Sequence, residues 1–355
     1  MKVTVVQDDI TSEISRIMDY EFDGTTTFYP HEFSVIDRET TLKDFGVGLI
    51  VGPSGSGKTT LLKEFGQEVE PLWDGDKSIA SHFKDIDDVQ DRLGAVGFNS
   101  IPSWLRPYHV LSNGEQFRAR LARQLDSNIV VDEFTSVIDR DVAKSCSNAI
   151  SRYVKRNNLK NIVFSSCHYD IIEWLQPDWV FDTLTGKLTT RGYQRPDIVL
   201  EIKPCTRDIW TTFSDHHYLD HNIHTGASCW IATWNDRLVG FLSSLSMPSG
   251  SLKNAWRAHR LVILPEYQGL GIGARLTDAL GDIHIAEGKR FYLKTTHPRL
   301  GEYCNRSEKW RGTSKNGIAR PDYQSNTSTY GGFADGLQKH MNRVCYSHEY
   351  IGTCP

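Results

Sequence analysis

The sequence predicts two domains in one chain, an α/β phosphate-loop domain followed by a mixed-sheet α+β domain. With 355 residues, the chain is longer than one ordinary hydrophobic core requires. In two places an apolar strand leads into a glycine-rich turn and then a helical pattern, at residues 47–60 and 258–287. A polar connector at residues 183–196 lies between them, so we place the domains at residues 1–194 and 195–355.

The composition predicts a globular protein of the cytosol. Hydrophobic residues make up 39% of the chain and charged residues 24%. No apolar run is long enough to cross a bilayer, and the first residues lack a signal-peptide pattern, so we expect a cytoplasmic protein with no membrane partner. The seven cysteines form no CxxC pair, which indicates reduced thiols.

Charge is distributed unevenly between the two predicted domains. The whole chain has a net charge of −4, but from residue 195 onward 19 Lys+Arg stand against 15 Asp+Glu. Residues 289–320 are the most basic segment, with nine bases and two acids. If the protein binds a nucleic acid, we therefore expect residues 289–320 to form the binding surface.

The first glycine-rich turn has the complete pattern G-x-x-x-x-G-K-[ST]. It consists of Gly52, Pro53, Ser54, Gly55, Ser56, Gly57, Lys58 and Thr59, and the helix begins at Thr60. In this pattern the main-chain N–H groups surround phosphate oxygens, and the ammonium of Lys58 reaches the β- and γ-phosphates. The hydroxyl of Thr59 is offered to Mg²⁺, so the turn predicts ATP and magnesium as ligands.

The motifs that follow resemble those of ABC-type ATPases in identity and order. Residues 111–115 (LSNGE) are similar to the ABC signature with two departures, and a helical pattern continues through residues 117–123. An apolar strand at residues 129–131 ends in Asp132 and Glu133, and His168 follows a later strand.

This resemblance implies roles for the matching residues and a homodimer. Asp132 would hold Mg²⁺ through water, Glu133 would polarise the attacking water, and His168 would contact the γ-phosphate. Ser112 and Gly114 of one copy would cap the ATP held by the other, so that ATP joins two subunits. The interval between the phosphate loop and the signature is short, which implies an abbreviated helical subdomain and argues against a transporter.

The second domain is predicted to begin with a strand at residues 198–202 and a helix at residues 206–219. A hairpin follows, with strands at residues 229–234 and 238–242 around Asn235 and Asp236. The next strand ends near Leu264, and a helix is expected at residues 274–287.

The turn before that last helix resembles the acyl-CoA motif of GNAT acyltransferases, Q/R-x-x-G-x-G/A. The match is Gln268-x-x-Gly271-x-Gly273. The resemblance covers residues 198 to about 310. It implies that the pyrophosphate of acetyl-CoA, or of another acyl-CoA, lies at the start of the helix. The implied contacts are Leu264, Gln268 and the main chain of Gly269, Leu270, Gly271, Ile272, Gly273 and Ala274. The oxyanion donor is expected to be a main-chain N–H on the strand at residues 261–264.

Acid and base candidates follow from the same resemblance. Tyr303 is the positional candidate for the acid that protonates the departing thiolate. His216 and His217 lie in the predicted helix that borders the acceptor, and because neighbours on a helix do not share a face, at most one of them faces the substrate. We name His217. His297, beside the thioester, is a further candidate.

The acceptor is left open by the sequence. Aromatic residues interleave with the bases of residues 289–320, a mixture that suits phosphate contacts and base stacking but equally a solvated face with buried aromatics. The pattern of histidines is similar to that of Mom-type phage DNA-modification acyltransferases, which favours a nucleobase amine of DNA. The alternatives are RNA, a protein or small amine, and a non-catalytic DNA-clamping ABC module.

Overall fold

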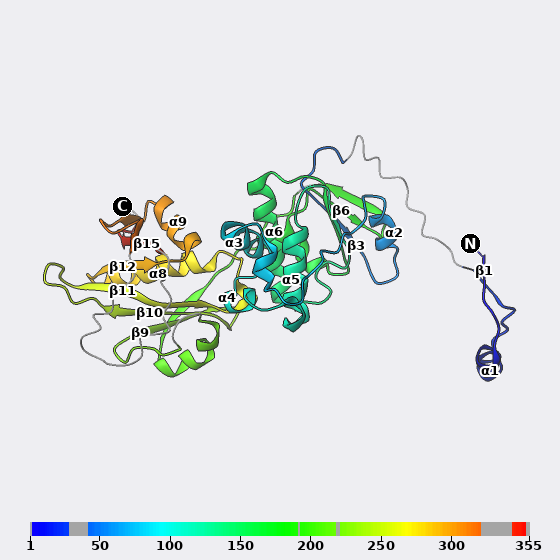
Figure 1. Ribbon diagram of the computed structural model, residues 1–355, viewed down its shortest axis with the longest axis horizontal. Coiled ribbons are helices and arrows are strands. Elements are labelled where there is room, and N and C mark those ends of the chain that lie inside the picture. The colour runs from blue at the N-terminus through cyan, green and yellow to red at the C-terminus, as the bar shows by residue number, and fades with distance from the viewer. Residues whose placement is uncertain (1, 28–41, 191, 218–220, 321–342, 353–355) are drawn as a thin grey trace. The chain divides into compact units, whose positions relative to one another are not determined.

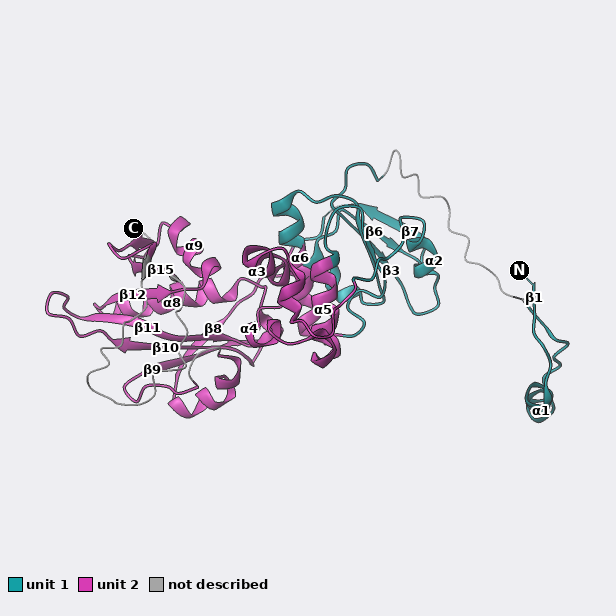
Figure 2. Cartoon of the chain, viewed as in Figure 1, with its two compact units in different colours: residues 1–71, 124–137, 151–194 teal, residues 72–123, 138–150, 195–355 magenta. Residues whose placement is uncertain are grey.

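The computed structural model describes the whole chain except residues 1, 28–41, 191, 218–220, 321–342 and 353–355 (Figure 1). It forms two compact units, coloured separately in Figure 2. Unit 1 contains residues 1–71, 124–137 and 151–194, and unit 2 contains residues 72–123, 138–150 and 195–355. One boundary between the units lies at 194/195, but residues 72–123 and 138–150, which precede it in the chain, group with residues 195–355.

Unit 1 is built on a parallel sheet. Its elements in chain order are β1 (Lys2–Thr4), α1 (Asp9–Met18), β2 (Thr25–Thr27), β3 (Val47–Val51), α2 (Lys58–Leu62), β4 (Val130–Val131), β5 (Ile162–Ser166), η3 (Tyr169–Ile171), α7 (Ile172–Leu175), β6 (Trp179–Asp182) and β7 (Lys187–Thr190). The main sheet has the order β4-β5-β3-β6-β7, and all pairs are parallel except β6 with β7. Helix α6 (Arg140–Asn157) contributes residues to both units.

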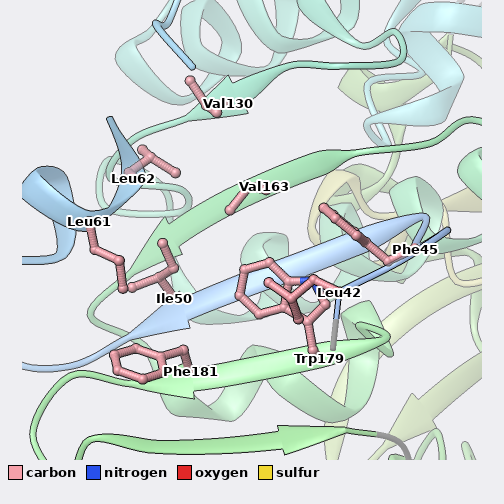
Figure 3. Packing of buried hydrophobic residues seen from close by; sticks show 9 residues of the cluster. All are labelled: Leu42, Phe45, Ile50, Leu61, Leu62, Val130, Val163, Trp179 and Phe181. Atoms are coloured by element: carbon pink, nitrogen blue, oxygen red, sulfur yellow. The ribbon is translucent and has the colours of Figure 1, made fainter. Parts of the chain in front are cut away.

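The hydrophobic core of unit 1 is built around β3, the central strand of this sheet. All five residues of β3 are buried, as expected for a strand between two parallel neighbours. Nine hydrophobic residues pack together beside it (Figure 3), and the ring of Trp179 lies among them, 5.5 Å from that of Phe45. Gly48 makes room for that ring, because a Cβ at this position would lie 2.0 Å from the Trp179 side chain.

Unit 2 combines a helical part with a large mixed sheet. The helical part has η1 (Ile79–His82), α3 (Ile86–Ala95), α4 (Ile101–Trp104), η2 (Tyr108–Val110), α5 (Asn113–Gln124) and the beginning of α6. The rest has β8 (Glu201–Cys205), η4 (Arg207–Thr212), η5 (Ser214–His216), β9 (Ser228–Trp234), β10 (Arg237–Ser246), β11 (Ala255–Ile263), η6 (Pro265–Tyr267), α8 (Ile272–Ala286), β12 (Arg290–Thr295), α9 (Pro298–Arg306), β13 (Trp310–Gly312), β14 (Ile318–Arg320) and β15 (Arg343–Tyr350).

The sheet of unit 2 runs β13-β15-β12-β11-β10-β9-β8, with β14 paired to β15. Every pair is antiparallel except β11 with β12. The fold class is thus the one predicted, and the hairpin turns at Asn235 and Asp236, both of which have positive φ.

Two local predictions for this unit are wrong. The first strand lies at Glu201–Cys205, three residues later than expected, and the helix predicted at residues 206–219 is replaced by the short 3₁₀ segments η4 and η5. In a 3₁₀ turn, side chains three residues apart lie on the same side. This spacing buries both Trp210 and Phe213 against Phe241 of β10.

The packing at Gly48 predicts the cost of one added methyl group. Gly48→Ala should lower the melting temperature by a few degrees, because overpacking a core costs about 1–3 kcal/mol. Thermal unfolding followed by circular dichroism measures it. Gly75→Ala is the matched control, since nothing lies within 4 Å of a Cβ there. Equal melting temperatures for the two variants would contradict this account of the core.

Candidate nucleotide and acyl-CoA sites

The first candidate site is the turn between β3 and α2, where the predicted phosphate loop of residues 52–59 lies. Gly57 precedes the helix with a φ of 87°, and no side chain caps the helix. Lys58 Nζ donates to the carbonyl oxygens of Gly52 (2.9 Å) and Pro53 (2.8 Å), which holds the ammonium over the loop. Uncapped main-chain N–H groups and a lysine ammonium fit the phosphates of a nucleotide.

The predicted magnesium ligands lie together. Thr59 Oγ1 donates to Asp132 Oδ2 at 2.7 Å. Ser165 donates to the other carboxylate oxygen of Asp132, and the main-chain N–H of Asp132 donates to Glu68 Oε2 at 3.1 Å. A hydroxyl and an oriented carboxylate are the oxygen ligands that Mg²⁺ prefers, so these residues fit the ion. Thr60, which follows in α2, has an exposed side chain.

Glu133 and His168 are placed at the carboxyl ends of β4 and β5. Glu133 is exposed and has a φ of 50°, a conformation that costs energy in a residue other than glycine. Its N–H donates to Ser165 Oγ at 3.1 Å. His168 Nδ1 lies 3.1 Å from the hydroxyl of Thr135, whose φ is 74°. Strain held at a strand end beside a nucleotide motif is typical of a catalytic segment.

The signature residues lie in unit 2, at the start of α5. Glu115 accepts from both the N–H and the hydroxyl of Ser112, each at 3.0 Å, and Ser103 Oγ donates to Glu115 at 2.7 Å. Ser112 and Glu115 thus form a capping pair three residues apart. Glu115, one of the two departures from the ABC signature, therefore stabilises the start of the helix. Gly114 lies within its first turn.

The second candidate site is the turn between β11 and α8. Gly271 precedes α8 with a φ of 80°, and no side chain caps this helix. The N–H groups of Ile272, Gly273 and Ala274 belong to its first turn and have no partner within the helix. Gln268 Nε2 donates to the carbonyl of Ile263 at 2.9 Å, which closes the loop. The uncapped start of a 15-residue helix fits a pyrophosphate group.

Strand β11 has an open side next to this turn. Parallel pairing with β12 runs only from Ala255–Arg290 to Arg257–Tyr292, although β11 continues to Ile263 and β12 to Thr295. The main chain of residues 258–263 on that side therefore pairs with no described strand. An extended acyl-CoA arm can bond to such a strand edge as an added strand would.

The register of β11 shows which main-chain N–H groups of residues 261–264 are occupied by β10. The N–H of Leu264 donates to the carbonyl of Val239 at 2.9 Å and is occupied. Because hydrogen-bonded and non-bonded pairs alternate in antiparallel strands, the N–H groups of Leu261 and Ile263 face away from β10 instead. Of the N–H groups of residues 261–264, those of Leu261 and Ile263 are therefore not used by β10.

Sequence reasoning missed His259, which lies at an irregularity of β11. Ser243 pairs with Arg260 and Ser244 with Ala258, so His259 is an extra residue of β11, the arrangement of a β-bulge. Its Nε2 accepts from the N–H of His224 at 3.3 Å. Burial, followed by the charges of Arg260 and other neighbours, lowers the pKa of His259 to about 4. No motif marks this residue, because a bulge depends on the partner strand.

The two adjacent histidines, His216 and His217, differ in burial. His216 is exposed, whereas His217 is half-buried and packs edge-on to Trp210 with ring centroids 5.6 Å apart. His217 also acts electrostatically on His259. Trp210 and His259 are thus neighbours of His217. His297 caps the start of α9.

Tyr303 is held by a buried carboxylate. Its hydroxyl donates to Asp278 of α8, and Trp310 Nε1 donates to the other oxygen of Asp278 at 2.8 Å. Burial and this bond raise the pKa of Tyr303 to about 12. Protonation of a departing thiolate by Tyr303 thus requires that its bond to Asp278 open first.

In the basic segment of residues 289–320, fewer aromatic rings and basic side chains are available to a nucleic acid than its composition suggests. Phe291 and Trp310 are buried in the core, which leaves them unable to stack on bases. Arg290 and Arg311 both pair with Glu349, at 2.6 and 2.7 Å. These residues therefore fit a solvated, ion-paired face with buried aromatic rings better than a surface on which aromatic rings stack on bases.

Neither a membrane helix nor a clustered metal site is found in the part of the chain that the structure describes. No helix there is long and apolar enough to span a membrane. No group of three or more His, Cys, Asp or Glu side chains there is arranged to hold a metal ion.

The Acetyltransferase (GNAT) family model matches residues 195–302. Among curated proteins none matches this chain. The structure is similar to that of a Bacillus subtilis acetyltransferase in complex with CoA, with 14% identity, a TM-score of 0.29 and coverage of 43% of this chain and 98% of that one. It is also similar to a GNAT acetyltransferase from Elizabethkingia anophelis with acetyl-CoA bound, with 14% identity, a TM-score of 0.30 and coverage of 42% and 97%.

A different set of solved structures is similar to another part of the chain. The dimeric ATP-binding cassette MJ0796, bound to ADP and Pi, shares 14% identity with a TM-score of 0.33 over 41% of this chain and 86% of that one. The cbiO1 protein of Clostridium perfringens, part of an ABC transporter complex, shares 18% identity with a TM-score of 0.32 over 42% and 78%.

The geometry of the first site predicts the phenotype of Glu133→Gln. The variant should bind ATP like the wild type but hydrolyse it more slowly by on the order of a hundredfold or more, because an amide is a much poorer proton acceptor than a carboxylate. Binding is measured by calorimetry and hydrolysis by phosphate release. Lys58→Ala, which removes the phosphate ligand, should lose binding itself. Wild-type turnover by Glu133→Gln would show that Glu133 is not the catalytic carboxylate.

The lowered pKa of His259 predicts acid sensitivity. Since the folded pKa of about 4 lies below the ordinary value of 6.5, the unfolded chain binds more protons between these values. The stabilising contribution is complete above pH 6.5 and is lost as the pH falls toward 4. His259→Gln, which cannot titrate, should show a smaller fall in melting temperature between pH 7 and pH 4.5 than the wild type. An identical fall in both proteins would rule out this role.

Proposed function

We propose that this protein is an acyltransferase whose activity depends on ATP, with the nucleotide bound in unit 1 and acyl-CoA bound in unit 2. The observation that carries the proposal is the open side of β11 leading into the uncapped start of α8. One side of a strand without a partner suits the extended arm of the cofactor, and free N–H groups at its end suit the pyrophosphate. The family match over residues 195–302 agrees with this reading.

The residues of unit 2 suggest how transfer proceeds. His217 takes a proton from the acceptor amine, whose nitrogen then attacks the thioester carbonyl carbon. The N–H of Leu261 or Ile263 stabilises the negative charge that develops on the carbonyl oxygen. The C–S bond breaks, the acyl group stays on the amine nitrogen, and the CoA thiolate takes a proton. The proposed donor of that proton is Tyr303, once its bond to Asp278 opens.

In the first site, Mg²⁺ would supply charge neutralisation at the phosphates when bound, held by Thr59 and Asp132. Glu133 would orient and deprotonate the attacking water, and His168 would contact the terminal phosphate. The resemblance of residues 111–115 to the ABC signature is the basis for proposing a homodimer in which Ser112 and Gly114 contact ATP held by the phosphate loop of the second copy. We therefore expect Glu133→Gln to elute as a dimer in the presence of ATP.

The proposed acceptor is an amine on a nucleobase of DNA. Its support is the net positive charge of residues 195–355, together with exposed bases such as Arg306 and Lys315. The burial of Phe291 and Trp310 removes the stacking part of that argument. RNA, a protein and a small amine are the other acceptors to be distinguished, along with a non-catalytic DNA clamp.

Labelled acetyl-CoA tests the proposed function. The protein is incubated with it, ATP and either duplex DNA, tRNA, total protein or polyamines, and label transfer is counted. We expect transfer to DNA that requires Lys58. Gly271→Asp should abolish acetyl-CoA binding, because a carboxylate would face the pyrophosphate and the φ of 80° strains any side chain.

Two outcomes separate the parts of this proposal. If label is transferred only to tRNA, protein or polyamines, the protein is an acyltransferase but DNA is not its acceptor. Unchanged acetyl-CoA affinity in Gly271→Asp would remove the acyltransferase itself. Reversing the charges of Arg306 and Lys315, which leaves the Glu349 pairs intact, should weaken DNA binding and reduce its salt dependence without altering acetyl-CoA affinity.

A further inference from the structure

The acyl-CoA loop of residues 268–271 is packed against helices that precede the acyltransferase sheet in the chain. Asn148 Nδ2 of α6 donates to the carbonyl of Gly269 at 2.8 Å. On the same helix, Asp141 accepts from Arg237 at 2.7 Å and lies 3.4 Å from the hydroxyl of Tyr267. All of these residues belong to unit 2. The loop is thus held from outside the sheet that carries it.

The main chains at this contact approach so closely that glycine is needed on both sides. A Cβ at Gly269 would lie 3.1 Å from Ala149 Cβ, 3.2 Å from the Ser145 carbonyl oxygen and 3.3 Å from Gly97 Cα. A Cβ at Gly97 would lie 3.0 Å from the carbonyl oxygen of Gln268. The φ angles of Gly97 and Gly269 are 71° and 95°, which also favour glycine.

The acyl-CoA pattern does not require a glycine at position 269, so the glycine there must have another structural cause. In Q/R-x-x-G-x-G/A the glycines are Gly271 and Gly273, and Gly269 occupies an unrestricted position. What requires a glycine there is the positive φ and the contact with α6. The loop is therefore adapted both to an anion and to this helix.

Asn148 is fully buried, with an exposed fraction of 0%. Its Oδ1 has no hydrogen-bond partner among the described residues, which carries a desolvation cost. The bond from its Nδ2 to Gly269 offsets part of that cost. A buried amide in this position fixes the direction of the Gly269 carbonyl, and with it the peptide plane that follows.

The signature helix contacts the same loop through Gly97. Arg118 of α5 is buried, and its Nη1 donates to the carbonyl of Gly97 at 3.4 Å. Burial lowers the pKa of Arg118, while charges including those of Asp139 and Glu266 oppose the shift. Asp139 precedes α6, and Glu266 lies two residues before the acyl-CoA loop. Helices α5 and α6 therefore both bear on residues 266–271.

From these contacts we infer that Asn148 is a positioning residue for acyl-CoA and links acyl-CoA affinity to the nucleotide state. The inference rests on the proposed function, in which ATP binding acts on the signature at the start of α5. A shift of α6 relative to the sheet would displace Asn148, which donates to the Gly269 carbonyl, and a shift of α5 would act on Gly97, which packs against the same loop. Acyl-CoA then binds with different affinity, and by reciprocity acyl-CoA changes the affinity for ATP by the same factor.

Calorimetry on the full chain tests this link. Acetyl-CoA is titrated with and without a non-hydrolysable ATP analogue and Mg²⁺, into the wild type, Asn148→Ala and Ser147→Ala. In the wild type the analogue should change the acetyl-CoA Kd by about 5–150-fold. Asn148→Ala should weaken acetyl-CoA binding by about 5–10-fold, as expected for one lost hydrogen bond, and bring the analogue-dependent factor close to one.

Ser147→Ala is the matched control. Ser147 is also buried on α6, and its hydroxyl has no hydrogen-bond partner among the described residues. This variant should keep both the acetyl-CoA Kd and the analogue-dependent factor. The reverse titration, ATP analogue into protein with and without acetyl-CoA, should give the same factor in the wild type. A residue that merely supports the fold would lower affinity without removing that reciprocal factor.

A second variant covers the case in which Asn148→Ala fails to fold. Arg237→Ala removes the ion pair to Asp141 from a side chain that is 70% exposed, so it leaves no cavity. It should reduce the analogue-dependent factor in the same direction. If the wild type binds acetyl-CoA and the analogue leaves its Kd unchanged, or if Asn148→Ala behaves like Ser147→Ala, the inference is wrong. If the wild type binds no acetyl-CoA at all, the proposed function itself fails.

Discussion

The close approach of Gly97 and Gly269 is the contact on which the organisation of unit 2 depends. With a side chain at either position the two main chains would have to separate, because the built Cβ atoms meet backbone at 3.0–3.3 Å. This contact, together with the Asn148 bond, places the beginning of α6 with the large sheet of unit 2. It explains why the compact units do not follow the order of the two motif sets along the chain.

Both candidate sites use the same physical device, the uncapped start of a helix after a glycine with positive φ. Gly57 precedes α2 and Gly271 precedes α8, and neither helix has a capping side chain. Free N–H groups and the positive end of a helix favour phosphate oxygens. What differs is the surrounding chemistry. The first site adds Lys58 and the Thr59–Asp132 pair, whereas the second adds the open side of a strand.

Buried polar contacts around the second site define which groups are available for chemistry. Asp278 engages Tyr303, and Val239 engages the N–H of Leu264. Arg290 and Arg311 are engaged by Glu349. The Tyr303 hydroxyl, the Leu264 N–H and the two guanidinium groups could each donate to a ligand, but in this structure each already donates to a protein acceptor. The N–H groups of Leu261 and Ile263, by contrast, face the open side of β11.

The sequence by itself determined the parts whose residues lie next to one another. The phosphate loop and the Gln268–Gly271 turn are local patterns in which a strand, a turn and a helix follow directly, so their place in the fold could be predicted from order and spacing. Tertiary structure alone decided the rest. Asn148 reaches Gly269 across 121 positions and Tyr303 reaches Asp278 across 25, and the bulge at His259 exists only in register with β10. Such pairings carry no sequence period, because they arise when separate elements pack and bury polar groups that must then find partners.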